Sequence, residues 1–480
     1  MAAKQLIEPR TLKGFNDVLP EQAALRRAVI RTVEEAFELY GFAPLETPAL
    51  EYLDTLLGAG GEETNKEMFR LESPEGDPIA LRFDHTVPFA RVLAQYPDLL
   101  KTPFRRYAVG PNWRADKPGQ WRLRQFTQVD IDVAGPDSVA VDAEVLSAIT
   151  TVMQRLNARG FVIQVNNRKL IDALLDGCGI HDPARAKHVL RVIDKLEKVG
   201  LDAVRRELGE GRIDDSGDPI PGVRLEADVI DRLLAFIAIS GATRGEVVDH
   251  VAAALPASDL TDKAVAEMRD LDACLTALGV GDAHVVFSPS LARGLDYYTG
   301  PVFEIGLPDA SAIGSFGGGG RYDGLVDRFL NRRIPCTGFA FGLERLLGAL
   351  EAVDALPETP PRTEVLVVTM GRVPLAETLR LASELRAAGL RTEPYFASRK
   401  KMGMGNQLSH ADHYGVPVAV ILGEDELANG VVSIKNLMEG KRRREDITDR
   451  EAYRAAGKAG QVSVARTEMV ATVIAMLGRA

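Results

Sequence analysis

The first regular pattern in the chain is a helical stripe of apolar residues between Glu21 and Tyr40. The residues on this stripe are Leu25, Val29, Val33 and Phe37. Their spacing predicts an amphipathic helix that ends before Gly41. The proline-punctuated segment that follows, as far as Leu56, predicts a strand that leads into a second, short helix.

A different periodicity governs residues 102–135, where polar and apolar residues alternate on both sides of the turn-rich stretch ADKPGQ. This pattern predicts a long antiparallel hairpin. If the second arm is a strand, its successive side chains point to opposite faces of the sheet. One face then carries Arg122, Arg124, Phe126, Gln128, Asp130 and Asp132. The other face carries Leu123, Val129, Ile131 and Val133.

The polar face of this arm has two interpretations. Alternation of this kind is typical of an antiparallel sheet with one solvated face. A binding surface is the alternative, because Phe126 would otherwise be exposed and because Arg105, Arg106 and Arg114 on the first arm are expected to add cations near one end. A gradient from arginines through an aromatic ring to carboxylates suits a ligand with a polyanionic tail, a flat ring and a cationic end. ATP together with an amino acid is such a ligand.

Between Leu170 and Leu278 the pattern changes to amphipathic helices with a period of 3.6 residues. Strand-like, glycine-rich sequence resumes at Val285, so this helical block is predicted to be an insertion. Three prolines within residues 357–361 predict a linker. Beyond them, strand and helix patterns alternate as β-α-β-α-β, which predicts a small α/β domain with a mixed sheet.

Two glycine-rich segments are further candidates for ligand binding. The segment CTGFAFGLERLLGAL (336–350) predicts a strand that runs into a helix, with Arg345 near the helix start. A helix N-terminus suits a phosphate group, and the alternative is that Glu344 and Arg345 are surface charges. The four glycines at 317–320 would let the backbone approach a ligand closely, and the alternative is a flexible turn. The P-loop pattern GxxxxGK[ST] is absent.

Composition narrows the class of protein. At 480 residues the chain predicts roughly two to four domains, because it is too long for one hydrophobic core. The net charge is −10, but the residues from Arg362 onward carry a net positive charge, so a polyanion could meet the C-terminal part. The cysteines Cys178, Cys274 and Cys336 are far apart, which suggests neither a disulfide nor a zinc site and fits a reducing compartment. No apolar run approaches the ~20 residues of a membrane helix.

These segments resemble the motifs of the class II aminoacyl-tRNA synthetases. Motif 1 is similar to GFAPLETPALE (41–51), motif 2 to the hairpin arms FRRYAVGPNWR (104–114) and RLRQFTQVDIDVAG (122–135), and motif 3 to GFAFGLERL (338–346). Two segments resemble the signatures of the histidyl-tRNA synthetase family, RGLDYYTG (293–300) and GGGRYDGL (318–325). Further segments similar to that family are LRFDHTVPFARVLA (81–94) and GEDELANGVVSIKNL (423–437). The resemblance covers nearly the whole chain.

The resemblance implies an α+β fold built on the antiparallel-sheet catalytic core of the class II synthetases, with a helical insertion domain and a small C-terminal α/β anticodon-binding domain. The implied domains are the first part of the catalytic domain (1–168), the insertion (169–282), the second part of the catalytic domain (283–354), a linker (355–362) and the anticodon-binding domain (363–480).

The activity implied by the resemblance is that of an ATP-dependent histidine–tRNA ligase. L-Histidine and ATP would give histidyl-adenylate and pyrophosphate, and the histidyl group would then pass to the 3′ end of tRNA(His), releasing AMP. The resemblance also implies Mg²⁺ at the phosphates, a homodimer formed through motif 1, and a cytoplasmic protein with no membrane partner.

The roles of individual residues are likewise expectations from the resemblance. Arg114, Gln128 and Arg293 are expected at the catalytic centre, where Arg114 would bridge the histidine carboxylate and the α-phosphate and Arg293 would add a second cation. The residues expected to bind histidine are Asp84, Thr86, Arg114, Gln128, Asp132, Arg293, Tyr297 and Tyr298; among them, Asp84, Thr86 and Gln128 would hold the ammonium group, and Asp132 with the tyrosines would hold the imidazole. The residues expected to bind ATP are Arg114, Asp116, Arg122, Phe126 and Arg345. No metal site formed by a protein motif is expected.

Contacts to tRNA are expected from Arg399, Lys400, Lys401, Arg442 and Arg443, although short basic runs are also typical of solvated surface. Three positions depart from the family pattern. His85 stands where Leu is usual and is expected to point away from the site. Asp132 is shorter than the Glu of many bacterial members, and the loop GQWRLRQF (119–126) leaves open which acceptor-end base is read.

Two related classes of protein are alternatives. One is a regulatory subunit of ATP phosphoribosyltransferase, which shares this fold without aminoacylation. The other is a class II synthetase for threonine, proline or glycine, which would lack the two histidine signatures.

Overall fold

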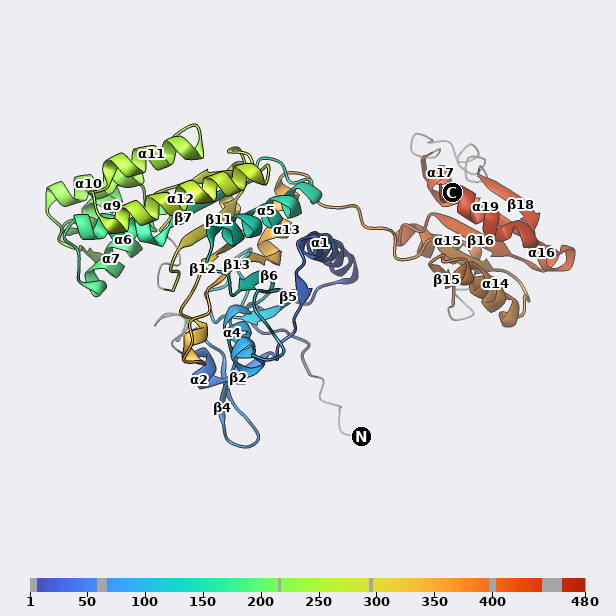
Figure 1. Cartoon of the computed structure of the whole chain (residues 1–480). Coiled ribbons are helices and arrows are strands. Elements are labelled where there is room, and N and C mark those ends of the chain that lie inside the picture. The colour runs from blue at the N-terminus through green and yellow to red at the C-terminus, as the bar shows by residue number, and fades with distance from the viewer. Residues whose placement is uncertain are drawn as a thin grey trace. The chain divides into compact units, whose positions relative to one another are not determined.

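The computed structural model describes residues 7–57, 67–214, 217–292, 297–396, 403–442 and 460–479, and for residues 197 and 440–442 it describes the backbone alone. The chain forms two compact units, Met1–Glu358 and Thr359–Ala480 (Figure 1). Among the helices in the described ranges, none is long and apolar enough to cross a lipid bilayer.

An eight-stranded, mostly antiparallel sheet forms the centre of the first unit. Its strands, in the order in which they lie across the sheet, are β1 (Ala43–Pro44), β5 (Phe104–Trp113), β6 (Gln125–Ala134), β13 (Cys336–Gly342), β12 (Gly317–Arg321), β11 (Pro301–Gly306), β7 (Val162–Asn167) and β10 (Val285–Phe287). The two outermost pairs are parallel. Strands β5 and β6 are the arms of the hairpin predicted from the sequence, and together with β13 they form the middle of the site described below.

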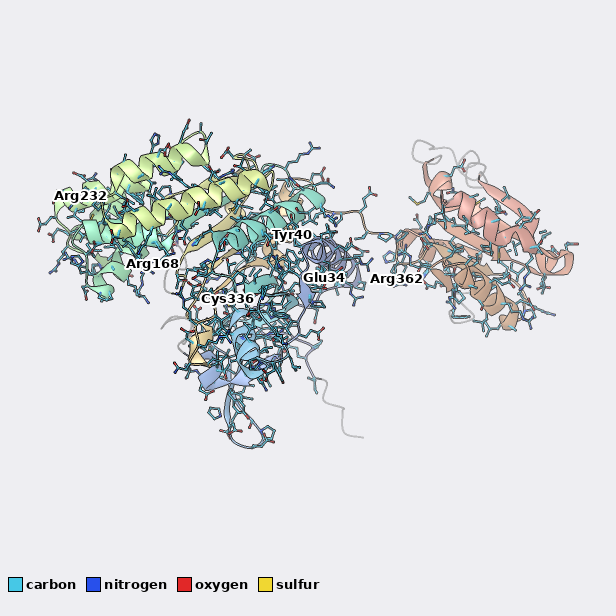
Figure 2. All side chains as sticks on the ribbon, in the orientation of Figure 1. Glu34, Tyr40, Arg168, Arg232, Cys336 and Arg362 are labelled. Atoms are coloured by element: carbon cyan, nitrogen blue, oxygen red, sulfur yellow. The ribbon has the colours of Figure 1, made fainter. Side chains whose placement is uncertain are left out.

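Helices cover the apolar face of this sheet. They are α1 (Pro20–Leu39), α5 (Val139–Arg155) and α13 (Leu343–Ala352), and the short helix η1 (Pro308–Ile313) contacts α13. The predicted helix at Glu21–Tyr40 is therefore confirmed, and its buried residues Val29, Val33 and Phe37 join the main core. Tyr40, labelled in Figure 2, ties the end of α1 to α5 through its hydroxyl, which lies 2.9 Å from Ser147 Oγ and 2.8 Å from Thr151 Oγ1.

A second layer lies over part of the polar side of the sheet. It contains a small sheet of β2 (Leu50–Tyr52), β4 (Pro78–Leu81) and β3 (Arg70–Glu72), and the helices α2 (Leu53–Leu56), α4 (Thr86–Gln95) and η2 (Val326–Arg328). A separate apolar cluster joins Phe83 and Phe89 at α4 to Tyr322 and Val326, which follow β12. The polar side of the sheet is thus enclosed by protein where these elements cross it.

The predicted insertion is helical, as expected. Its elements are α6 (Arg168–Gly177), α7 (Pro183–Ile193), α8 (Leu196–Val199), α9 (Leu201–Leu208), the hairpin β8 (Gly211–Ile213) and β9 (Pro219–Pro221), α10 (Ala227–Ile237), α11 (Arg244–Ala254) and α12 (Asp259–Ala277). Side chains of Asp182, Thr243 and Ser258 cap the first turns of α7, α11 and α12. Helix α12 packs against α5 and α6, which attaches the insertion to the helical layer of the sheet (Figure 1).

The second unit is the predicted small α/β domain with a mixed sheet. Its strands, in spatial order, are β15 (Thr392–Pro394), β14 (Val365–Thr369), β16 (Val418–Leu422), β17 (Val431–Asn436) and β18 (Gln461–Ala465). The first three are parallel and the last two antiparallel. Its helices are α14 (Leu375–Ala387), α15 (Met404–His413), α16 (Glu424–Asn429), α17 (Leu437–Arg442), η4 (Arg466–Glu468) and α19 (Met469–Met476). Apolar clusters lie on both faces, so every residue of β14 and β16 is buried.

Candidate active site

The side chains of β6 separate into two faces, as the period of two predicts. Val129 and Ile131 point into the main core, and Asp130 and Asp132 line a cavity on the opposite face. Strand β6 begins at Gln125, so Arg122 and Arg124 precede it instead of extending its polar face. A tight turn bridging Gly119 and Arg122 interrupts the hairpin there, because the segment KPG cannot continue a regular ladder.

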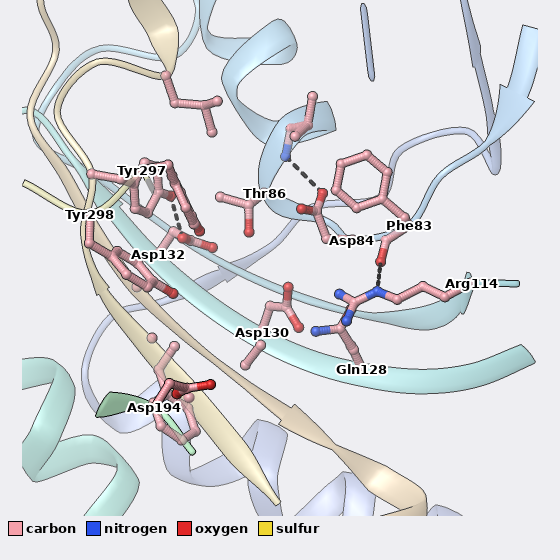
Figure 3. Close-up of a pocket in the computed structure, with 18 of the residues that line it drawn as sticks. Phe83, Asp84, Thr86, Arg114, Gln128, Asp130, Asp132, Asp194, Tyr297 and Tyr298 are labelled. Atoms are coloured by element: carbon pink, nitrogen blue, oxygen red, sulfur yellow. Dashed lines mark hydrogen bonds between the residues drawn. The ribbon is translucent and has the colours of Figure 1, made fainter. Parts of the chain in front are cut away.

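The first cavity has a volume of about 530 Å³ and opens beside the centre of β6 (Figure 3). Its lining side chains come from the eight-stranded sheet, from the start of α4 and from the insertion helix α7. Its polar and aromatic lining residues include Asp84, Thr86, Arg114, Gln128, Asp130, Asp132, Lys187, Arg191, Asp194, Tyr297, Tyr298 and Tyr322. A volume of this size suits a small molecule such as an amino acid with part of a nucleotide.

Glycines make room for this cavity. The tract at 317–320 is strand β12 in the middle of the sheet, so the flexible-turn alternative is wrong. On the neighbouring β13, a Cβ at Gly338 would lie 2.0 Å from Asp132 Oδ1. The absent side chain at Gly338 therefore leaves Asp132 the space that it occupies.

Asp132 is held by two buried groups. Its Oδ2 lies 2.5 Å from Arg106 Nη2, and its Oδ1 accepts a hydrogen bond from the Tyr322 hydroxyl. Arg106 is 1% exposed and also lies over the Phe89 ring, 4.9 Å from its centroid. Burial raises the pKa of Asp132 to about 6, while Arg106 and Tyr322 act to lower it.

Two tyrosines lie beside Asp132. The rings of Tyr297 and Tyr298 stack with their centroids 4.5 Å apart, and Figure 3 shows both close to Asp132. Burial raises the pKa of Tyr298 to about 12 and that of Tyr297 well above its usual value. Both hydroxyls therefore stay protonated at neutral pH and can donate hydrogen bonds to a ring nitrogen.

The start of α4 carries the other residues predicted to hold an ammonium group. Asp84 Oδ1 accepts a hydrogen bond from Val87 N at 3.1 Å, and Thr86 is the first residue of the helix. Burial raises the pKa of Asp84. On β6, Gln128 Oε1 accepts a hydrogen bond from Asn112 Nδ2 at 2.6 Å, so Gln128 presents its amide nitrogen to the cavity (Figure 3).

Arg114 lies between this cavity and a second one. Its Nε donates to the carbonyl oxygen of Phe83 at 3.1 Å, and its guanidinium lies 5.2 Å from the centroid of the Phe126 ring. Arg114, Gln128 and Gly318 line both cavities, so the two spaces meet at this cation.

The second cavity has a volume of about 350 Å³ and contains the residues predicted to bind ATP. They are Arg114, Asp116, Arg122, Phe126 and Arg345, and Glu304 and Glu344 also line it. Arg122 Nε lies 2.6 Å from Asp116 Oδ2, and Arg345 Nη1 donates to the carbonyl oxygen of Ser315 at 2.9 Å. Burial acts to raise the pKa of Asp116, but hydrogen bonds with Glu67 and Arg122 and the positive charge of Arg122 hold it below its usual value.

Two groups of predicted residues either lie outside the described residues or are placed differently from the prediction. Arg293, Arg399, Lys400, Lys401 and Arg443 lie outside the described residues, as does the side chain of Arg442. Arg105 and Arg106 were expected near the cationic end, but the antiparallel register sets Arg106 opposite Asp132 and turns Arg105 to the other face, where it pairs with Glu144.

His85 is buried, its Nε2 bonds to the Gly110 carbonyl oxygen at 3.2 Å, and burial lowers its pKa to about 3. It lines neither cavity, as expected.

Several site residues were not predicted from the sequence. Tyr322, which holds Asp132, lies in the segment GGGRYDGL, and that segment was itself a signal. Arg191 and its neighbours on α7 reach the cavity through packing of the insertion, for which the sequence offers no signal. No cluster of metal-binding side chains occurs among the residues that the structure describes.

The chain is similar to known proteins over nearly its whole length. Residues 14–346 match the family profile described as histidyl-tRNA synthetase, and residues 364–455 match that of an anticodon binding domain. The histidine–tRNA ligase of Caulobacter vibrioides is 39% identical, with 98% of this chain and 97% of that protein covered. That of Ruegeria pomeroyi is 40% identical, with 96% of each covered.

Solved structures agree with the sequence comparisons. The crystal structure of histidyl-tRNA synthetase from Nostoc sp. PCC 7120 superposes with a TM-score of 0.79 at 30% identity and covers 98% of this chain and 99% of that chain. A Bacillus halodurans structure described as an ATP phosphoribosyltransferase regulatory subunit/histidyl-tRNA synthetase has a TM-score of 0.70 at 21% identity, which shows a shared fold alone. The chain belongs to the histidyl-tRNA synthetase family, whose members charge tRNA(His) with histidine using ATP.

Proposed function

We propose that this chain activates L-histidine with ATP and transfers the histidyl group to the 3′ end of tRNA(His), releasing AMP and pyrophosphate. The observation that supports it best is the meeting of two cavities at Arg114. The first cavity is lined by carboxylates and tyrosines together with Lys187 and Arg191 on α7. The second is lined by arginines and Phe126 together with Asp116, Glu304 and Glu344. The ammonium group of an amino acid suits the carboxylates of the first cavity. The phosphates of a nucleoside triphosphate suit the arginines of the second.

In the activation step, a carboxylate oxygen of histidine attacks the α-phosphorus of ATP, and the bond from that phosphorus to the pyrophosphate oxygen breaks. Both reactants are anionic where they meet, so a cation between them lowers the barrier. Arg114 lies at that junction, held by the Phe83 carbonyl and the Phe126 ring. A preorganised donor of this kind contributes about 10²–10³ in rate. Arg293 stays a prediction for the second cation. Gln128 was expected to hold the ammonium group, but because its amide nitrogen faces the cavity, it is proposed here as a donor beside the substrate carboxylate instead.

Histidine would bind along β6 with its ring at the end formed by Asp132, Tyr297 and Tyr298, and its ammonium group at Asp84 and Thr86. Fixed polar groups around a ring discriminate strongly, because an analogue without the ring nitrogens leaves them unpaired in a buried site. The Arg106–Asp132 ion pair fixes the orientation of the carboxylate that reads the ring.

ATP would lie in the second cavity, with the adenine on Phe126 and the phosphates near Arg122 and Arg345. Mg²⁺ prefers hard oxygen ligands. Asp116 and Glu304 offer such oxygens there, and Asp116 Oδ1 is buried without a hydrogen-bond partner among the described residues. These carboxylates would hold Mg²⁺, which neutralises phosphate charge when bound.

The transfer step requires tRNA. The proposed domain boundaries are those expected from the sequence, with the anticodon-binding domain at 363–480, supported by the profile match over residues 364–455. Arg399, Lys400, Lys401, Arg442 and Arg443 stay predictions for its tRNA contacts. A homodimer formed through motif 1 and a cytoplasmic location, both expected from the family resemblance, also belong to the proposal.

ATP–pyrophosphate exchange, measured with each amino acid in turn, tests the activity. Histidine-dependent exchange followed by charging of tRNA(His) is the expected result. Exchange with another amino acid would point to a different class II synthetase, and absence of exchange would point to a regulatory subunit. Arg114→Ala should lower the exchange rate by about 10²–10³ without loss of helical circular dichroism.

A further inference from the structure

Asp130 is a buried carboxyl group in the first cavity to which no role has been assigned above. It is 1% exposed, and within the described part of the chain its Oδ1 has no hydrogen-bond partner. Its neighbours across the sheet are Ala108 on β5 and Ala340 on β13, neither of which can pair with a charge. An unpartnered buried acceptor costs free energy, so a site that keeps one is expected to use it.

Two other carboxyl groups of the cavity, those of Asp84 and Asp132, are already engaged. Asp132 is held by Arg106 and Tyr322, and one oxygen of Asp84 accepts a hydrogen bond from Val87 N. Asp130 therefore has the largest free acceptor capacity on the sheet face. Figure 3 shows its carboxyl group pointing into the cavity, on the side where Thr86 and Asp84 lie.

The position of Asp130 along β6 identifies the part of the ligand that it would meet. Gln128, two residues before it, presents an amide nitrogen, which is a donor and suits the substrate carboxylate better than an ammonium group. Asp132, two residues after it, lies with Tyr298 at the end proposed for the ring. Histidine carries its ammonium and carboxylate groups on the same carbon, one methylene group away from the ring, so the position between Gln128 and Asp132 falls beside that carbon. Of the two groups on it, the ammonium group is the one that a carboxylate accepts hydrogen bonds from.

We propose that Asp130 is a histidine-binding residue whose carboxylate, together with Asp84 and Thr86, accepts hydrogen bonds from the substrate's α-ammonium group. This inference rests on the proposed function, because it concerns the same cavity and substrate. It adds a third acceptor, which gives the ammonium group one partner for each of its three hydrogens.

Binding is then coupled to a proton. Burial raises the pKa of Asp130 well above its usual value. The charged groups that face it are Arg82, Asp84, Arg106, Arg114 and Asp132, and Tyr298 faces it as well. In the empty site burial favours the protonated form of Asp130, and the arriving ammonium group favours the ionised form, so that histidine binding releases a proton to the solvent.

The variant Asp130→Asn keeps the shape and removes the charge. We expect it to raise the KM for histidine about 10- to 100-fold, as for loss of a hydrogen bond to a charged group, and to change the KM for ATP by less than about threefold. Inhibition by 3-(imidazol-4-yl)propionate, which is histidine without its amino group, should be equal in the variant and the unaltered chain. The matched control is Asp323→Asn. Asp323 is a buried aspartate that also has one oxygen without a hydrogen-bond partner among the described residues, and it lines neither cavity, so the KM for histidine should stay unchanged in this variant.

Isothermal titration of the unaltered chain in buffers of different ionisation enthalpy tests the same inference without a substitution. Histidine should release more protons on binding than 3-(imidazol-4-yl)propionate does. Equal proton release by the two ligands, or an unchanged KM for histidine in a folded Asp130→Asn variant, would overturn the role of Asp130. Absence of histidine-dependent exchange in the unaltered chain would instead overturn the proposed function.

Discussion

Arg106 and Asp132 face each other across β5 and β6, and both are buried. A buried ion pair is weak evidence for stability, because desolvation offsets the attraction between the charges. In this site the ion pair serves to orient Asp132. Together with the Tyr322 hydroxyl, Arg106 fixes the carboxylate that is proposed to hydrogen-bond to the ring of histidine. Removing one member would leave the other charge uncompensated inside the sheet.

Arg106→Met should therefore lower the free energy of unfolding by about 3–5 kcal/mol, measured by urea denaturation at neutral pH. The matched control is its neighbour Arg105, whose pair with Glu144 is partly exposed; Arg105→Met should cost about 1 kcal/mol or less. Equal losses in the two variants would show that the buried pair does not differ from a surface pair.

The carboxyl groups of the first cavity also predict how histidine binding depends on pH. Burial raises the pKa of Asp132 to about 6 and raises those of Asp84 and Asp130. A carboxyl group with a raised pKa holds its proton below that pKa. Ionised Asp84 and Asp130 attract the ammonium group, and ionised Asp132 accepts a hydrogen bond from a ring N–H. The KM for histidine should fall as the pH rises from about 5.5 to about 7.5, by up to about tenfold per pH unit for each proton released. Steady-state exchange over this range, with the KM for ATP measured alongside, checks the prediction, and a flat profile for histidine would contradict it.

At the scale of elements, the site is a face of one sheet from which glycines remove side chains. Strand β12 is formed by the glycine tract and β13 contributes Gly338, so that the cavity lies directly on the backbone. On the other face of the same sheet, large side chains such as Phe339 and Phe341 of β13 pack in the main core. One sheet thus packs a core and opens a cavity at the same positions along its length.

Gly338→Ala tests this arrangement. The added methyl group would lie 2.0 Å from Asp132 Oδ1 and 2.6 Å from the Ile131 carbonyl oxygen, so the sheet or the carboxylate must move. We expect a loss of about 1–3 kcal/mol in the free energy of unfolding, with a raised KM for histidine. Gly306→Ala on β11, where an added Cβ meets nothing within 4 Å, should change stability by no more than about 0.5 kcal/mol. If Gly338→Ala changed neither the free energy of unfolding nor the KM for histidine, Asp132 would not need the space that Gly338 leaves.

The elements themselves were predictable, and their exact pairing was not. Alternation with period two placed Gln128, Asp130 and Asp132 on one face before any coordinates, because a strand has no other way to bury Val129 and Ile131. The register between the hairpin arms depends on the length and shape of the loop at 114–124, which the alternation does not encode. Arg106 was for that reason expected at the wrong end of the gradient.

At the scale of the whole molecule, the first unit contains both cavities and the second unit matches the anticodon-binding profile. The residue pattern alone predicted ATP and an amino acid but not which amino acid, because the same charge gradient would suit many amino acids. The choice of histidine came from the resemblance of two short segments, and the comparisons confirmed the family. The lining by α7 could not be predicted, because it depends on how an inserted domain packs.

The central claim is that one sheet face holds histidine and ATP in adjoining cavities that meet at Arg114. The most direct test is a crystal structure with a non-hydrolysable analogue of histidyl-adenylate. The account predicts the imidazole beside Asp132 and Tyr298, the phosphate mimic at Arg114 and the adenine on Phe126. An analogue bound with its adenine in the cavity of Asp132, or bound away from β6 altogether, would contradict it.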